Sequence, residues 1–264
     1  MKRKFWGIVC VLVLCSISMI SWKPVTAGEK AEYQKTAPTA KELFGKYVDQ
    51  LYQTAQLQAT GLSEVVFEKA LTGFINLKIA NKLPKESNIV TVVDLSMPSH
   101  EKRMWIVDVL NKSLLLNTWV AHGDGSGDDM ANYFSNVNDS HASSLGFYVT
   151  DNVYMGKHGR SLRLDGMDEG FNDNARMREI VVHAAKYVGQ GTIDKLGHLG
   201  RSWGCPAVSP KVANRVINTI QGKTMLFING NDSSYTSKYL DEDQSANYVA
   251  SSDQAFGKVM ASLN

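Results

Sequence analysis

The sequence predicts a mainly β domain, from about residue 88 to 240, that follows an N-terminal helical segment. Apolar residues repeat at helical spacing between residues 40 and 80, and short β-branched and apolar runs follow them. The chain has 264 residues, of which 44% are hydrophobic and 20% are charged, as in an ordinary globular protein. Disordered, collagen-like and low-complexity classes are therefore excluded.

The first 27 residues are typical of a signal peptide. Basic residues at positions 2–4 precede an apolar run from Phe5 to Cys15, and Val25-Thr26-Ala27 places small residues at a cleavage site. The alternative is an uncleaved membrane anchor, because the segment from Phe5 to Trp22 is just long enough to span a bilayer. We favour cleavage, since the fully apolar part is short. We therefore expect export to the periplasm or cell envelope, with no stable membrane insertion after cleavage.

Charge and cysteine content narrow the function classes. Removal of the predicted signal leaves 24 basic and 26 acidic side chains, whereas a nucleic-acid-binding protein would carry a basic excess. We therefore expect no nucleic-acid partner. Cys10 and Cys15 lie in the predicted signal, so the exported chain retains only Cys205 and forms no internal disulfide. Cys205 is then an intermolecular bridge, a buried inert thiol or a reactive nucleophile.

The predicted helical segment spans residues 28–87 and begins with a polar lead-in. Gly61 separates two amphipathic repeats, and Ser63 is placed to cap the second. We expect an antiparallel helix pair whose role is packing. The apolar positions are Leu43, Tyr47, Leu51 and Ala55 in the first repeat, and Val66, Ala70, Phe74 and Ile79 in the second.

The pattern then changes to short strands. Asn111-Lys112-Ser113 predicts a hairpin turn, and Ser209-Pro210 predicts the start of a helix that runs to about Gln221. Residues 241–264 form a predicted C-terminal tail without a clear fold signal, although Ala255–Leu263 is compatible with a short helix. The predicted strands are Ile89–Leu95, Met104–Leu110, Leu114–Ala121, Phe147–Val153, Ser161–Leu164, Ile180–Ala184 and Thr224–Ile228.

The surroundings of Cys205 favour a reactive thiol. The residue lies in a glycine-rich loop, where Gly204 allows a substrate or another backbone to approach closely. Backbone N–H groups of such a loop can converge on an oxyanion, and Arg201 would favour the thiolate if it points inward. A cysteine nucleophile also needs a base. Among the six histidines we prefer His183, which ends an apolar strand, over His198, which lies in the loop.

The segment Ser202-Trp203-Gly204-Cys205, with His183 upstream, resembles the S-x-G-C signature of the murein L,D-transpeptidase catalytic domain family (YkuD-like). Several further segments occur in the right order for a divergent branch of that family. They are His122–Gly127, Phe134–Asn136, Ser143–Tyr148 and Gly156–Gly166. The resemblance covers about residues 90–235 and implies a β-sandwich catalytic domain over residues 88–240.

The resemblance also implies a chemistry. Cys205 would attack a peptide carbonyl of a peptidoglycan stem next to a terminal D-residue, and His183 would take the thiol proton and later protonate the leaving amine. The N–H groups of Gly204 and Cys205 would form the oxyanion hole, and Ser202 would shape the site. The thioester would pass to an acceptor amine or to water, giving transpeptidase or carboxypeptidase activity. No metal or organic cofactor is required.

Substrate contacts are expected from side chains near this site. Two interpretations remain open for residues 158–163: recognition of stem or acceptor carboxylates, or a strand with an ordinary polar face. We assign substrate binding to His158, Arg160, Arg163, Arg201 and Trp203.

The chain also departs from the common family pattern. Pro206 and Ala207 stand where an aliphatic residue and then Arg or Asn are usual, and Ala184 stands where Gly is usual. The long spacing between His183 and Cys205 predicts an inserted loop around Gly189–Lys195. These departures concern specificity more than chemistry. The alternatives are a catalytically silent peptidoglycan-binding scaffold of the same fold and an exported cysteine peptidase that acts on proteins.

Overall fold

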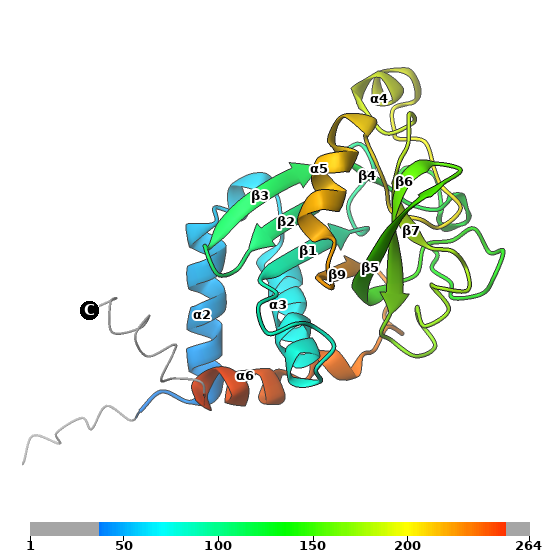
Figure 1. The fold of residues 1–264 in the computed structure, drawn as a ribbon. Coiled ribbons are helices and arrows are strands. Elements are labelled where there is room, and N and C mark those ends of the chain that lie inside the picture. The colour runs from blue at the N-terminus through cyan, green and yellow to red at the C-terminus, as the bar shows by residue number, and fades with distance from the viewer. Residues whose placement is uncertain (1–36, 252–264) are drawn as a thin grey trace, which may run out of the picture. The chain divides into compact units, whose positions relative to one another are not determined.

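The computed structural model describes residues 37–251, and the predicted signal peptide and the segment Ala255–Leu263 lie outside them. The described residues from Pro38 onward belong to one compact unit. Figure 1 shows a curled sheet with the helices α2, α3 and α6 on one side. Within residues 37–251, no helix has the length and apolar character needed to cross a membrane.

The sheet confirms the mainly β fold class. Its nine strands have the order β3-β2-β1-β9-β5-β6-β7-β8-β4, and the pairs β1–β9 and β7–β8 are parallel. The two edge strands, β3 and β4, are separated in the chain by Trp119 alone, so the sheet curls until its edges meet. The strands are β1 Ile89–Asp94, β2 Met104–Asp108, β3 Ser113–Thr118, β4 Val120–Ala121, β5 Gly146–Gly156, β6 Gly159–Gly166, β7 Val181–Ala184, β8 Ala207–Val208 and β9 Met225–Asn229.

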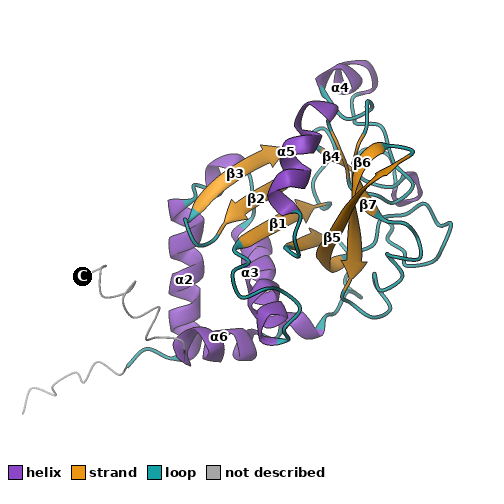
Figure 2. Ribbon diagram, in the orientation of Figure 1, coloured by secondary structure: helices purple, strands orange, loops and turns teal. Residues whose placement is uncertain are grey.

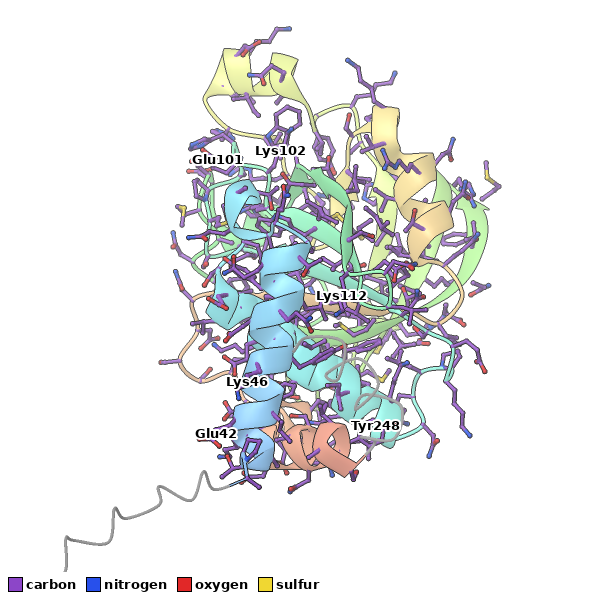
Figure 3. The ribbon with its side chains drawn as sticks, turned by 90° about the vertical axis from the view of Figure 1, so that its left-hand side faces the viewer. Glu42, Lys46, Glu101, Lys102, Lys112 and Tyr248 are labelled. Atoms are coloured by element: carbon purple, nitrogen blue, oxygen red, sulfur yellow. The ribbon has the colours of Figure 1, made fainter. Side chains whose placement is uncertain are left out.

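The helices surround this sheet (Figure 2). Thr39 and Glu42 form a capping box that starts α2, and Ser63 is the N-cap of α3 without a side-chain cap bond. In Figure 3 the exposed side chains of Glu42 and Lys46 lie along α2, and Tyr248 lies on α6. The helices are α2 Ala40–Thr54, α3 Glu64–Ile79, α4 Gln190–Leu196, α5 Pro210–Ile220 and α6 Glu242–Ser251, with 3-10 turns at Gln58–Thr60, Asp124–Ser126 and Lys238–Leu240.

Two core layers lie on opposite faces of the sheet, because side chains alternate along each strand. On β1, Val90 and Val92 pack with α2 and α3, whereas Val93 packs in the layer that contains α5. Gly73 of α3 faces the Phe147 ring so closely that an added Cβ would overlap the ring. A glycine at this helical position therefore lets α3 approach the sheet.

Most predicted elements are confirmed, with differences at three places. The prediction of one strand over Leu114–Ala121 is wrong, because the chain leaves the sheet edge at Trp119 and continues as β4. The predicted inserted loop around Gly189–Lys195 contains the helix α4. The helix α6 has no signal in the sequence, since it is polar and Ser-rich. It is held by Ala246 and Val249, which are buried in the core layer that contains α2 and α3, and an exposed ion pair joins Lys41 to Asp243.

Candidate active site

The sequence-predicted nucleophile and base line one cavity of about 710 Å³. Cys205 comes from the loop before β8, and His183 comes from β7. The β5–β6 hairpin, the loop before β7 and residues 138–141 supply the other walls. The curled sheet thus brings segments that are distant in the chain to one place.

The cysteine loop is fixed by its own backbone and by Ser202. The Ser202 hydroxyl donates to the Cys205 carbonyl at 2.6 Å and accepts the Gly204 N–H at 3.1 Å. Gly204 has φ +106°, and an added Cβ would lie 2.7 Å from the Ala142 carbonyl oxygen. Outside the loop, the Ser202 N–H donates to the His122 carbonyl at 2.9 Å. The Gly204 N–H is therefore committed to Ser202 here, and its part in an oxyanion hole stays a prediction.

The thiol of Cys205 is half-buried between backbone groups. Its sulfur accepts the Val181 N–H at 3.4 Å and lies 3.6 Å from the Glu179 carbonyl oxygen, to which the S–H can donate. Glu179 has φ 54°, an uncommon conformation for a non-glycine residue, and this turn directs its carbonyl at the thiol. Burial raises the pKa of the thiol, although the Val181 N–H and the positive charge of Arg178 each lower it.

Arg178 is a residue that the sequence analysis did not select. Its guanidinium donates to the carbonyls of Ser135 and Ala142, both at 2.7 Å, and to the hydroxyls of Ser140 and Ser144. It therefore ties residues 135–144 to the loop before β7 while placing a half-buried positive charge near the thiol. Its position just before the strand that carries His183 was the available sequence signal.

His183 is buried in β7, where it pairs with Ser161 of β6 and Ala207 of β8. Its Nδ1 lies 2.9 Å from the Ala184 carbonyl oxygen, so Nδ1 carries the hydrogen and Nε2 is the acceptor. Burial lowers the pKa of His183, although the hydrogen bond to the Ala184 carbonyl raises it. The nearby His158 and Lys157 lower the pKa further.

These shifts favour a neutral thiol and a neutral imidazole over a thiolate–imidazolium pair. Among residues 37–251, no hydrogen bond joins Cys205 to His183. Catalytic hydrogen bonds are often long without substrate, so both groups remain available to a bound peptide.

Four of the five predicted substrate-binding residues line the cavity: His158, Arg163, Arg201 and Trp203. Arg160 does not, and its assignment to substrate is corrected. Arg160 and Arg163 are three positions apart on β6, so they project to opposite faces of the sheet. The Arg160 guanidinium donates to the Asn218 side chain of α5 at 2.6 Å.

Aromatic rings hold the cations at the cavity mouth. Trp203 is 65% exposed, stacks on His141 at 4.6 Å between ring centroids, and has the Lys157 ammonium 5.3 Å from its centroid. The Arg163 guanidinium lies 4.3 Å from the centre of the Tyr154 ring. Within the described chain, Arg201 pairs with Asp128, whereas Lys157 and Arg163 form no ion pair. Two positive charges therefore face the cavity without carboxylate partners.

A family model described as the L,D-transpeptidase catalytic domain, of the YkuD type, matches residues 58–229. The chain belongs to this family. The match begins within the N-terminal helical segment and includes both Cys205 and His183.

Several solved structures are similar to the chain at low sequence identity. One is an L,D-transpeptidase from Mycobacterium smegmatis, at 12% identity and a TM-score of 0.34, covering 55% of this chain and 59% of that one. Another is a mutant of the helical cell shape determining protein Pgp2 from Campylobacter jejuni, at 11% identity and a TM-score of 0.38. The match covers 69% of this chain and 62% of that one. A third, from Stackebrandtia nassauensis, has 15% identity and a TM-score of 0.34, covering 72% and 94%.

The chain thus spans about three fifths of the length of the first of these structures. No curated protein matches it.

Proposed function

We propose that the protein is an exported cell-wall enzyme that transfers peptidoglycan stem peptides through a thioester on Cys205. The observation that carries this proposal is the shared cavity of Cys205 and His183, in which the imidazole Nε2 has no hydrogen-bond partner among the described residues. A neutral imidazole in this position can accept a thiol proton. Family membership supplies the substrate class.

The proposed reaction has two halves. His183 Nε2 takes the thiol proton as the sulfur attacks the carbonyl carbon beside the terminal D-residue. The resulting imidazolium protonates the leaving amine, the C–N bond breaks and a thioester remains. An acceptor amine or water then attacks the thioester, gives its proton to His183 and releases the thiol. An amine yields a cross-link, and water yields a trimmed stem.

The unpaired cations of the cavity support binding of an anionic peptide. Lys157 and Arg163 are positioned over aromatic rings, which limits the side-chain entropy lost when they bind a carboxylate. We assign the carboxylate of the stem or of the acceptor to them. Arg201 is less available, because it already pairs with Asp128.

Mass spectrometry of products tests the proposal. The purified protein is incubated under reducing conditions with tetrapeptide-stem muropeptides, beside Cys205→Ala and His183→Ala. Cross-linked or trimmed products that vanish in both variants are the expected result, and the product type assigns transpeptidase or carboxypeptidase activity. Turnover that survives in Cys205→Ala would contradict the thioester.

The silent scaffold is the second candidate, and one observation favours it. Burial raises the pKa of the thiol, and no hydrogen bond links it to the imidazole within the described residues. Binding to purified peptidoglycan by a folded protein that shows no thiol-dependent turnover would support this candidate.

A further inference from the structure

The turn between β5 and β6 reaches the base of the proposed reaction. Lys157 and His158 form a two-residue turn between the paired Gly156 and Gly159. The imidazole rings of His158 and His183 stack with centroids 4.3 Å apart and planes inclined by 25°. The other turn residue, Lys157, lies over Trp203 of the cysteine loop.

A stacked ring restricts an imidazole in a way that the hydrogen bond to Nδ1 does not. The bond to the Ala184 carbonyl fixes one edge of the His183 ring but leaves tilting about that bond possible. The His158 ring covers one face and opposes this tilt, and it also keeps water from that face. Small displacements of a reacting group reduce rates strongly, so restricted tilt has a kinetic consequence.

We propose that His158 is a positioning residue, which holds the face of the His183 imidazole and fixes the direction of Nε2 within the cavity. This inference rests on the proposed function, in which His183 is the base. It differs from direct substrate binding by His158, because the ring acts through its stack on His183 and not through a contact with a ligand.

The charges around His183 fit this role. Lys157 and His158, which lie in the turn, lower the pKa of His183. The facing strands contribute the uncharged residues Ser161 and Ala207. The other ionisable groups of the cavity are Asp139, His141, Tyr154, Arg163, Arg178, Glu179, Tyr187, Arg201 and Cys205. The pKa of His158 is itself lowered, by burial and then by Lys157. The stack therefore remains uncharged near neutral pH and does not repel itself.

The test compares two substitutions of His158 with a control on the same hairpin. His158→Ala removes the ring, and His158→Phe keeps a flat ring that cannot titrate. Arg160→Ala is the control, since Arg160 contacts α5 and does not line the cavity. Each full-length protein is assayed for kcat, KM and pH dependence with muropeptides. The His183 ring is also titrated by NMR, which requires no turnover.

For His158→Ala we expect kcat to fall about tenfold with KM nearly unchanged. The acidic limb of the pH profile moves to higher pH for two reasons. Lost burial raises the pKa of His183, and so does removal of the positive charge that His158 gains at acidic pH. His158→Phe restores most of kcat, and Arg160→Ala changes neither quantity. A substrate contact would instead raise KM in both His158 variants, and that outcome would overturn the proposal.

The NMR titration separates this inference from the proposed function. If the unmodified protein shows no turnover, the proposed function fails, but the His183 titration still reports on the stack. An upward shift in His158→Ala, absent from Arg160→Ala, supports the positioning role. An unchanged His183 titration in His158→Ala refutes it.

Discussion

The reactivity of Cys205 depends on the groups that surround its thiol. Its sulfur accepts one N–H, faces one carbonyl oxygen and lies near the charge of Arg178. Burial dominates these influences and raises the pKa of the thiol. The resting state is therefore a thiol that awaits a base, rather than a preformed thiolate.

Substitution of Arg178 tests this description of the thiol. Arg178→Gln removes the charge that favours the thiolate, so the pKa of Cys205 rises further. We expect alkylation by iodoacetamide at pH 8 to slow several-fold, on the order expected for loss of one nearby charge. Arg163→Gln is the matched control, because Arg163 lines the same cavity without acting on the thiol. Equal rates in Arg178→Gln and the unmodified protein would contradict the assignment.

The pH dependence of turnover tests the base. His183 must be neutral to accept the thiol proton, and burial lowers its pKa. It therefore remains competent at pH values where an ordinary histidine is protonated. We expect the acidic limb of kcat/KM to lie below the ordinary histidine value of about 6.5. A limb above this value would show that His183 is not the group that titrates.

The accuracy of the sequence-based predictions varied among elements. The β-branched runs correctly predicted strands such as β1, and Ser209-Pro210 correctly predicted the start of α5. At these places the local sequence pattern agrees with the burial of the side chains. α6 could not be predicted, since its contacts come from distant residues such as Asn76, whose side chain donates to the Tyr239 and Asp241 carbonyls.

The site was predictable to a similar degree. A glycine-rich cysteine loop and a strand-end histidine indicated Cys205 and His183. Lys157 lies within the family-like segment Gly156–Gly166 and Arg178 lies just before the strand of His183, but the sequence analysis selected neither. Their approach to the cavity depends on how the sheet curls. Arg160 does not line the cavity with Arg163, because residues three positions apart on a strand project to opposite faces of the sheet.

The close approach of α3 to the sheet gives a prediction for an element. Gly73→Ala adds a methyl group where the Phe147 ring lies, so the helix or the ring must move. Overpacking of this kind costs about 1–3 kcal/mol, which exceeds the helix propensity that alanine gains. Urea unfolding should show this loss. Gly45→Ala, on the open side of α2, is the control and should leave stability equal or slightly higher.

Acid stability of the whole molecule depends on a buried histidine. His122 accepts a hydrogen bond from the buried Arg103 at 2.6 Å, and burial followed by the charge of Arg103 lowers its pKa to about 4. The unfolded chain binds a proton near pH 6.5, whereas the folded chain does so only near pH 4. The contribution of His122 to stability is therefore expected to be complete above pH 6.5 and to be lost as the pH falls toward 4, by about 3 kcal/mol.

Unfolding by urea between pH 7.5 and 4.5 measures this loss. His122→Asn should be less stable at pH 7.5, because the buried Arg103 loses the imidazole among its hydrogen-bond acceptors. The stability of this variant should also vary less with pH. A pH dependence as steep as that of the unmodified protein would show that other groups are responsible.

The strand β8, which follows the cysteine loop, is paired with its neighbours over short stretches. β4 and β8 share only two residue pairs, Val120–Val208 and Ala121–Ala207, and this contact immediately follows the cysteine loop in the chain. Strand pairs of this length are weak by themselves, so we expect β8 to separate from its neighbours at a lower cost than the longer strand pairs of the sheet. Cys205 therefore lies next to a strand whose pairings on both sides are short, since β8 also shares only two residue pairs with β7. We therefore expect the thiol of Cys205 to lose its reactivity before the whole molecule unfolds.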